Sequence, residues 1–422
     1  MKRILVIAVI VLNLISTKSY GFDEIKLDLS AEDNIEQEDV LKYNLQEDFR
    51  FMQEDKLAIE IPIHPVYKDI EHHPHNETFF LNNAITRTVK DVYHLEVERT
   101  DVPSCLLAKQ LSKRFENGPF EKLHLWTAVQ SGFDTTIPQK GDTDTKFNVG
   151  LINVILDGTF RGGKESFRIM LDPTHQHNRP FMQQFVQDLF IQTTRIPHHT
   201  IMLGNTRVGV GHEGTMSPYT LPFINRSQIS RNLSNIRKFG LRVKGDYSLV
   251  DYDFGGYSSD TFFKEFFPGV EFNGMVNFKP LGMTDGRYGK LVTGGSISSG
   301  HNSVNYFLTG VYAGYEYKRF YTKFEYIHGN GSNSGSGPTT RKASGLCTTV
   351  AYKLTKKLEF LLRYDNYDPD EKIAHNYSRE YTAGINYYLK GQALKLILNY
   401  VYCQNQNSKD SHKILIGTQI IL

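Results

Sequence analysis

The chain of 422 residues combines modest hydrophobicity with many aromatic residues and glycines. It contains 27 Phe, 24 Tyr and 34 Gly, yet only 40% of its residues are hydrophobic and one is Trp. A formal net charge of +2 does not by itself indicate nucleic acid or any other charged partner. The three cysteines are odd in number and widely spaced, which argues against a disulfide framework and against a cysteine metal cluster.

The N-terminus predicts export. Lys2 and Arg3 precede an apolar run from residue 4 to 15, and small residues follow near Gly21. This order is that of a secretory signal peptide, too short to span a membrane, and we expect residues 1–21 to be removed. No later window has the roughly 18 uninterrupted apolar residues that a spanning helix needs. An exported chain of this kind is either soluble or a β-barrel.

Residues 22–118 differ from the rest of the chain. Thirteen acids and four bases lie between residues 22 and 60, and an apolar helical face recurs from Leu41 to Met52. Ser104 is placed to begin a second helix that ends near Gly118. The sequence Glu-His-His-Pro-His at 71–75 lacks a helical spacing of histidines, so we interpret it as a surface cluster and predict no metal site. We expect an acidic, partly helical periplasmic extension.

From residue 119 to the end, apolar and polar residues alternate. One example is the run Val270–Phe278, where every second residue is apolar. This period of two, repeated many times, predicts an all-β fold, a 16-stranded antiparallel transmembrane β-barrel with a wet interior over residues 119–422. The predicted strands are 123–134, 144–157, 165–173, 187–194, 199–208, 238–247, 249–258, 269–280, 287–299, 303–317, 319–328, 345–354, 357–367, 378–389, 392–404 and 412–422.

The predicted connections alternate in length, as they do in bacterial barrels. Turns such as 355–356 and 390–391 are short, whereas connections such as 174–186, 209–237 and 329–344 are long. The connection 209–237 is the third external loop on this count. A loop of this length in a compact fold is usually functional or disordered.

The stretch from residue 207 to 245 concentrates positive charge. It has a single acid, Glu213, and no sustained period before residue 233. Alternation then directs Arg242 and Lys244 into the barrel, and we expect Met202 and Thr206 on the preceding strand to face lipid. The stretch is either an anion path or a solvated loop beside a half-buried strand. The candidate pore-lining residues are Arg207, Arg226, Arg231, Arg237, Lys238, Arg242 and Lys244.

Other signals predict neither catalysis nor a cofactor. The glycine-rich turn at 158–164 approaches a phosphate-binding loop, but Glu165 stands where Ser or Thr must bind magnesium. We find no nucleophile elbow and no metal spacing of histidines. The sequence therefore predicts a protein that is not an enzyme and that has no cofactor or metal. Glutamates such as Glu271 and Glu380 also point inward, so the lumen is expected to carry mixed charge, with Lys357 and Arg363 in a wider part.

The chain resembles the phosphate-selective porin O and P family. The resemblance is strongest in three segments: Gly-Asn-Thr-Arg at 204–207, Gly-His-Glu-Gly-Thr-Met-Ser-Pro-Tyr at 211–219, and Leu-Pro-Phe-Ile-Asn-Arg-Ser at 221–227. It implies a trimeric sixteen-stranded channel in the outer membrane, in which arginines and lysines guide anions. The expected partners are the lipid bilayer, small anions and two further copies of the chain. The family's lysine cluster cannot be placed here, and the final Leu422 is not aromatic.

The sequence thus favours an outer-membrane channel for passive diffusion of small anions, including phosphate-like ones, through a basic constriction. The alternative is a structural or binding barrel that is plugged by its loop and whose extension engages a periplasmic partner. A lipid hydrolase would need a Ser–His pair near the rim, and the sequence shows none. No nucleic-acid partner is expected.

Overall fold

The structure is a computed structural model. It describes residues 105–107, 110–174, 185–260, 265, 267–284, 286–334 and 337–422. The predicted signal peptide and the helix predicted at residues 41–52 lie outside these residues. Within them, no helix is long and apolar enough to cross a membrane.

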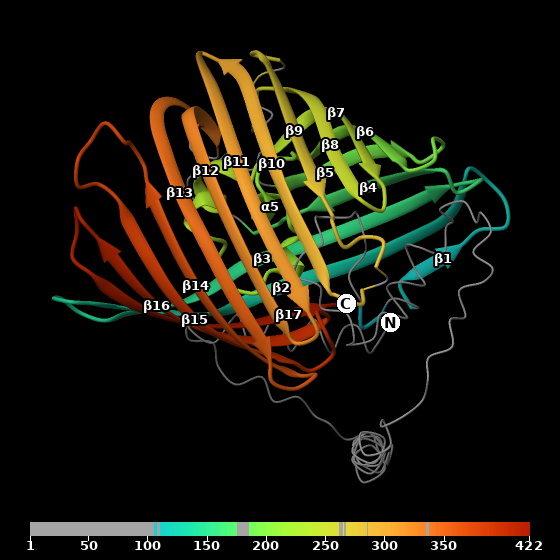
Figure 1. Cartoon of the computed structure of the whole chain (residues 1–422). Helices are drawn as coiled ribbons and strands as arrows, with labels where there is room; N and C mark the ends of the chain where they lie inside the picture. The colour runs from blue at the N-terminus through green and yellow to red at the C-terminus, as the bar shows by residue number, and fades with distance from the viewer. Residues whose placement is uncertain are drawn as a thin grey trace, which may run out of the picture. The chain divides into compact units, whose positions relative to one another are not determined.

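Long antiparallel strands form almost the whole described part of the chain (Figure 1). Their amino-acid pattern explains them, because one face of each strand is apolar and the other polar. The first eight strands of the ring are β2 (Phe120–Pro138), β3 (Asp144–Phe160), β4 (Glu165–Leu171), β5 (Val186–Thr193), β6 (His199–Arg207), β7 (Arg237–Asp246), β8 (Val250–Ser258) and β9 (Val270–Phe278). The remaining eight are β10 (Lys290–Asn302), β11 (Val304–Tyr317), β12 (Phe320–Ser334), β13 (Gly337–Lys353), β14 (Leu358–Asp368), β15 (Ser378–Tyr388), β16 (Leu394–Asn405) and β17 (Ser411–Ile421).

The sixteen strands β2 to β17 close into a barrel. Each strand pairs with the next along the chain, β9 pairs with β10, and the last strand pairs with the first through rungs such as Gly417↔Gly132. No edge is left at the closure, which is how barrels avoid unpaired strand edges. The predicted sixteen-stranded antiparallel barrel is confirmed, and most strand ends lie within three residues of the prediction.

The largest difference from the predicted strands is the β12–β13 hairpin. Residues 329–344 are predicted as a long external connection, but both strands continue into it and pair up to Ser334↔Gly337. This segment is rich in Gly, Ser and Asn, so it lacks the alternation of apolar and polar residues that predicts a strand. The strand pairing continues through it, with an irregularity between Asn330 and Ser332, and the Asn333 side chain donates to Ser259 O at 2.6 Å.

A short strand, β1 (Ser112–Arg114), extends the sheet before the barrel begins. It pairs with residues 122–124 of β2, on the side where β17 pairs with β2 only from Ala128 onward. It thereby covers backbone groups of β2 that β17 does not reach. Among the described residues 105–107 and 110–118 there is no helix, so the helix predicted to begin at Ser104 is absent there.

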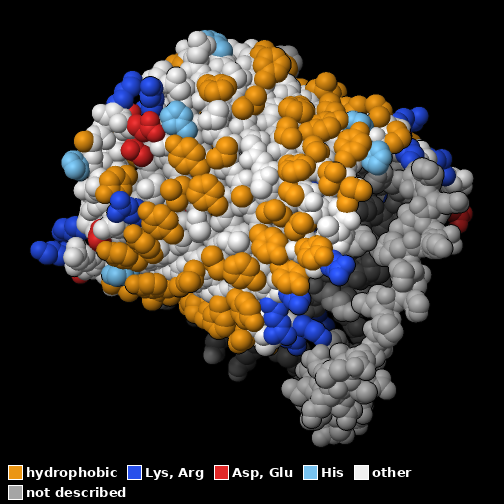
Figure 2. Space-filling model, viewed as in Figure 1, with side chains coloured by type: hydrophobic (Ala, Val, Ile, Leu, Met, Phe, Trp, Pro, Cys, Tyr) orange, Lys and Arg blue, Asp and Glu red, His pale blue; other side chains and the backbone are white. Residues whose placement is uncertain are grey.

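The two faces of the wall differ as the alternation predicts. Outward side chains are large and apolar, with Phe272 and Leu362 more than 60% exposed, whereas inward Glu325 is fully buried. Figure 2 shows hydrophobic side chains spread over the outer face, with Lys and Arg gathered near its ends. An apolar band flanked by charged ends is the surface that a lipid bilayer requires.

Candidate functional site

The connection between β6 and β7, residues 208–236, folds into the barrel; we call it the lumen loop. In Figure 1 its helix α5 (His212–Thr215) lies behind β10 to β12, inside the ring. The Tyr219 hydroxyl donates to Asn153 on β3 at 2.8 Å, while Lys323 on β12 donates to Glu213 at 2.7 Å. The loop therefore contacts opposite walls.

The lumen loop has an apolar core of its own against the inner wall. Nine of its apolar side chains are each less than 9% exposed. They are Val208, Val210, Met216, Tyr219, Leu221, Phe223, Ile229, Leu233 and Ile236. These residues pack on inward-facing apolar residues of the strands, such as Met275 and Tyr312. The inner wall beneath the loop therefore carries apolar patches among its polar residues.

Glycines in the wall make room for the loop. A Cβ atom at Gly345 would lie 2.5 Å from Ile229 Cγ2, and one at Gly417 would lie 2.9 Å from Ile224 Cδ1. On β15, a Cβ at Gly384 would come within 3.1 Å of the Phe223 ring. Each glycine is therefore a recess in which one loop side chain sits, and the recesses help to set the position of the loop.

The first turn of the loop is held by carboxylates. Gly211 has a φ of 69°, and the following backbone N–H groups of His212 and Glu213 donate to Glu325 on β12 at 2.7 and 3.1 Å. The Glu213 carboxylate in turn accepts from Ser227 N at 2.5 Å and from Lys323 Nζ at 2.7 Å. Burial alone would raise the pKa of the Glu213 carboxyl, but the charges of Lys323 and Arg363 lower it well below its usual range.

Two of the predicted pore-lining arginines stabilise the loop itself. The Arg226 guanidinium donates to the carbonyls of Glu213 and Met216, the latter at 2.6 Å. Arg207 donates to Gly214 O at 3.2 Å and to Asn235 Oδ1 at 2.5 Å. These contacts satisfy carbonyl groups that the short helix α5 leaves open.

Three further predicted residues form ion pairs on the wall. Lys238 meets Glu271 on β9 at 2.5 Å, and Arg242 meets Asp253 on β8 at 2.5 Å. All four side chains are at most 6% exposed. Arg237 meets Asp188 on β5 at 2.7 Å, and Lys244 is half-buried in register with Asp253. The positive charge of this wall is therefore largely matched by acids.

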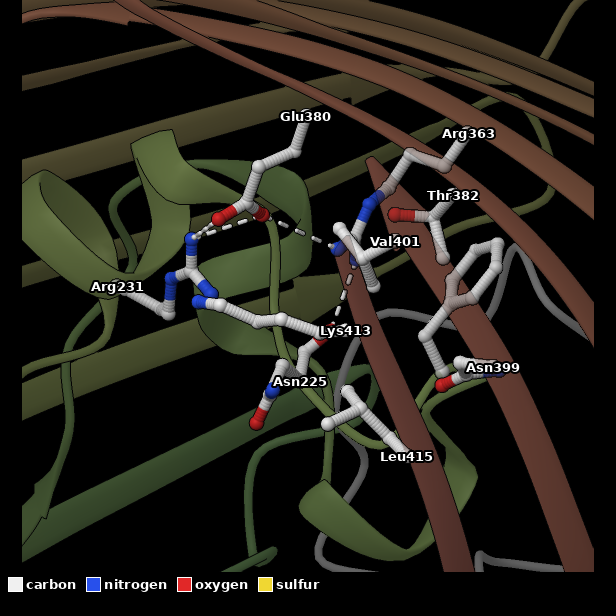
Figure 3. A pocket seen from close by; sticks show the side chains of 10 residues that line it. Asn225, Arg231, Arg363, Glu380, Thr382, Asn399, Val401, Lys413 and Leu415 are labelled. Carbon is white, nitrogen blue, oxygen red and sulfur yellow. Dashed lines mark hydrogen bonds and ion pairs between the residues drawn. The ribbon is translucent and has the colours of Figure 1, made fainter. Parts of the chain in front are cut away.

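Arg231 has a different environment from the other six residues. It lies in the π-helical turn Ser230–Ser234, and its Nη2 is 2.9 Å from Glu380 Oε1 on β15. It lines a pocket between the loop and strands β14 to β17, where about 270 Å³ is free of protein atoms, open solvent included. Figure 3 shows its guanidinium facing the Glu380 carboxylate across this pocket. The residues lining the pocket are Phe223, Asn225, Arg231, Arg363, Glu380, Thr382, Asn399, Val401, Lys413 and Leu415.

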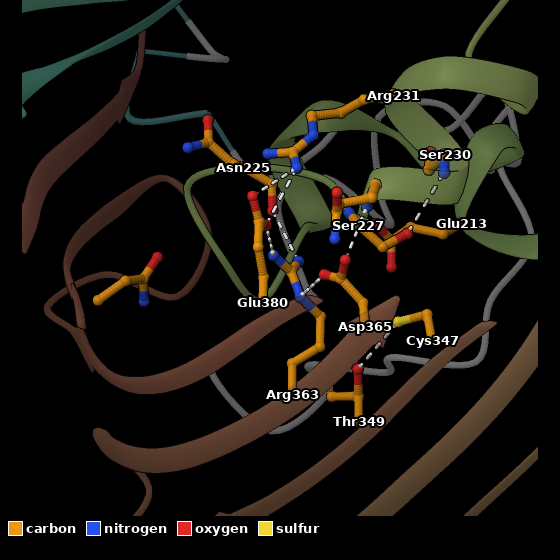
Figure 4. A network of polar contacts seen from close by, with 12 residues as sticks. Glu213, Asn225, Ser227, Ser230, Arg231, Cys347, Thr349, Arg363, Asp365 and Glu380 are labelled. Carbon is orange, nitrogen blue, oxygen red and sulfur yellow. Dashed lines mark hydrogen bonds and ion pairs between the residues drawn. The ribbon is translucent and has the colours of Figure 1, made fainter. Parts of the chain in front are cut away.

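Arg363 belongs to this site, although the sequence placed it in a wider part of the lumen. Its Nη1 donates to Asn225 O of the loop at 2.8 Å, and its guanidinium lies 4.6 Å from the Phe223 ring centroid. It also meets Asp365 at 3.0 Å and Glu380 at 4.0 Å (Figure 4). The expectation for Arg363 was wrong because strand alternation gives the face of a residue but not the path of a loop inside the barrel.

The expected orientation of β6 was also wrong. Met202 and Thr206 were expected to face lipid, but Met202 is 1% exposed and the Thr206 hydroxyl accepts from Arg242 at 3.2 Å. Leu203, between them, is the outward residue. The assignment failed because apolar residues occur on both faces wherever the wall packs on the lumen loop. Arg207 is buried beside the loop nevertheless.

The comparisons with known proteins agree with this fold. The profile of the phosphate-selective porin O and P family matches residues 283–420. This confirms the resemblance, although the matched segment lies C-terminal to the residues on which the resemblance was based. No curated protein sequence matches the chain.

Solved structures of porins match most of the described chain. An anion-selective porin from Comamonas acidovorans is 12% identical, with 71% of this chain and 99% of that chain covered and a TM-score of 0.54. OmpF of Salmonella typhi, in complex with daunomycin, is 12% identical with a TM-score of 0.53, covering 72% and 99%. OmpT of Vibrio cholerae in its trimer form is 9% identical with a TM-score of 0.51, covering 71% and 99%. The chain is an outer-membrane β-barrel with the porin fold.

Proposed function

We propose that this protein is a passive channel for small anionic solutes, narrowed by the lumen loop. The observation that carries the proposal is the charge around the pocket of Figure 3. Three cationic side chains, Arg231, Arg363 and Lys413, line it with the carboxylate of Glu380, and Arg363 is also paired with Asp365, so the cations exceed the carboxylates by one. An excess of fixed positive charge at a narrow point raises the local anion concentration and lowers that of cations.

The seven basic residues predicted from the sequence have two roles in this proposal. Arg231 contacts the solute, together with Arg363 and Lys413. The other six are structural: Arg207 and Arg226 stabilise the loop, and Arg237, Lys238, Arg242 and Lys244 stabilise the wall. The proposal extends to phosphate-like anions as permeating solutes and to a homotrimer. Support for the homotrimer is that OmpT of Vibrio cholerae, which has the same fold, is described in a trimer form.

A second candidate is the plugged barrel, and one observation favours it. The lumen loop is fixed to strands on opposite sides of the interior and has a buried apolar core. Such a loop is stable enough to close the lumen. The two candidates differ in a single measurable property, which is conductance.

The test is a recording from mature protein in a planar bilayer under a tenfold KCl gradient. A channel is expected, with a reversal potential on the anion-selective side. The double variant Arg231→Gln with Lys413→Gln should lower the anion-to-cation permeability ratio at least fivefold, because a unit charge about 4 Å from an ion contributes on the order of 1 kcal/mol even in water.

The matched control removes the same charge elsewhere. Lys140→Gln with Lys146→Gln changes two exposed lysines near the β2–β3 connection. Exposed charges are screened over about 10 Å at ordinary salt, so this control should leave the reversal potential close to that of the wild type. Equal shifts from both pairs would contradict the proposed constriction. Absence of any conductance would favour the plugged barrel.

A further inference from the structure

The pocket between the lumen loop and strands β14 to β17 has a charged side and an apolar side. Its floor consists of three neighbouring rungs of the barrel wall. The middle rung runs Arg363↔Thr382, Thr382↔Val401 and Val401↔Lys413. Direct partners in adjacent strands share a face, so all four side chains of this rung point into the lumen.

The rungs on either side differ in character. On one side Glu380 and its partner on β14, Asp365, continue the charged surface. On the other side the rung contains Gly384, Asn399 and Leu415. Because Gly384 has no side chain, the Phe223 ring of the loop settles over it. The pocket is therefore charged at one end, where carboxylates and basic side chains meet, and lined by phenyl and leucyl groups at the other.

Two polar groups of the pocket have no partner within the described part of the chain. The Thr382 hydroxyl is buried, with the residue 4% exposed, and forms no hydrogen bond. In Figure 3 its oxygen points toward the Arg363 guanidinium and the pocket. Lys413 also lines the pocket, and no hydrogen bond or ion pair of its ammonium group occurs with a described residue. A buried hydroxyl without a partner is uncommon in folded proteins, and a bound solute would satisfy it.

We propose that this pocket is a binding subsite for small organic monocarboxylates. The carboxylate lies among Arg231, Lys413 and the Thr382 hydroxyl, and the short hydrocarbon part lies against Phe223, Val401 and Leu415. This inference rests on the proposed channel function, since it gives the class of solute that the channel favours.

Glu380 has a particular role in this subsite. Its carboxylate already bridges Arg231 and Arg363, at 2.9 and 4.0 Å. The Glu380 carboxylate therefore occupies part of the position that a solute carboxylate would take, and it competes with the solute for the two arginines. Such competition keeps the solute weakly bound, which conduction through a pore requires.

The test measures binding separately from conduction. Mature full-length protein in detergent is titrated with sodium butyrate by ligand-detected NMR, and with sodium acetate, butyramide and sodium phosphate for comparison. Butyrate should bind about tenfold more tightly than acetate, because each further buried methylene contributes up to about fourfold in affinity. Uncharged butyramide and inorganic phosphate should both bind more weakly than butyrate.

Variants locate the site. Thr382→Val keeps the shape of the side chain and should weaken butyrate binding about tenfold, because a hydrogen bond to a charged group is lost. The control, Thr349→Val, changes a buried threonine that is paired with Arg363 on the other side and lies outside the pocket, and it should leave binding unchanged. Glu380→Gln should tighten butyrate binding severalfold by removing the competitor.

Each outcome separates the subsite from the channel. Equal affinity for butyrate, acetate and butyramide would overturn the subsite, and this comparison needs no variant to fold. Equal effects of the two threonine variants would overturn the assigned position. An anion-selective conductance without a preference for butyrate leaves the channel standing and removes the subsite. Butyrate binding that depends on Thr382, in a protein that does not conduct, supports the subsite and removes the channel.

Discussion

Basic side chains on two sides of the barrel interior have different surroundings. On the side formed by β7 and β12, Lys238, Arg242 and Lys323 each meet a carboxylate of their own at 2.5 to 2.7 Å and are almost fully buried. On the side formed by β14 to β17, Arg231 shares Glu380 with Arg363, which also meets Asp365 at 3.0 Å, and Arg231 remains 35% exposed.

The difference shows that a basic side chain that points into the barrel does not for that reason line the path of a solute. A buried charge with its own partner is already neutralised, and the loss of either partner is strongly destabilising. An exposed charge that shares its partner contributes little to stability but can still act on a solute. A basic residue stabilises the barrel when it is buried with a carboxylate of its own, and it can act on a solute when it is exposed and shares its carboxylate. The three predictions below test this division, beginning with the largest expected effect.

Lys323→Met should destabilise the barrel most. It leaves the buried carboxylates of Glu213 and Glu325 without their cation, and the loss of one partner of a buried pair costs about 3–5 kcal/mol. The free energy of unfolding in urea, measured in lipid vesicles, gives the effect. Lys146→Met, at an exposed side chain, is the control and should change stability by less than about 0.5 kcal/mol. Similar losses in both variants would contradict the buried-pair account.

A crossed pair of substitutions tests the division itself. Arg242→Gln should cost about 3 kcal/mol of stability, because Asp253 remains buried without its partner, and should change ion selectivity little. Arg231→Gln should cost less than about 1 kcal/mol but lower anion selectivity measurably. Unfolding and reversal potential are measured on the same two proteins. If both variants change both properties equally, the two sides of the interior do not differ in role.

The smallest effect is expected at a glycine recess. Gly384→Ala places a Cβ 2.8 Å from Asn399 Nδ2 and 3.1 Å from Phe223 Cε1, and should cost about 1 kcal/mol through overpacking. It should also push the ring into the pocket and reduce butyrate binding. The control is Gly150→Ala, where the nearest atoms are 3.6 Å away. Unchanged binding in the Gly384 variant would show that the ring has room to move elsewhere.

The outer face of the barrel was predictable from the sequence, and the interior was not. Lipid imposes one rule on every strand, so the alternation around Phe272 or Leu362 identifies the outward residues without knowledge of any partner. Inside, Met202 is a buried apolar residue on the inward face, so alternation of apolar and polar residues does not identify that face. The partners of the basic residues are remote in sequence, since Lys323 and Glu213 are 110 positions apart and Arg231 and Glu380 are 149 apart. No local pattern contains such pairings.

The length of the loop could be predicted, and so could its basic character. The sequence grouped Arg231 with six other basic residues. Composition cannot distinguish a basic residue that has its own carboxylate partner from one that shares a carboxylate with another basic residue. Thr382 and Lys413 were not found. Their place in the pocket follows only from the register of β14 to β17 together with the position of the loop in the lumen.

The attachment of the loop to the last strand has a consequence for the order of assembly. Gln419 on β17 donates to the carbonyl of Tyr219 at 3.0 Å, across 200 positions of sequence. Asn399 on β16 accepts from the backbone N–H of Ile224 at 2.9 Å. Contacts of such long sequence separation form late, since the intervening chain must first be ordered. The full set of contacts between the loop and the wall is therefore complete only once the C-terminal strands are in place.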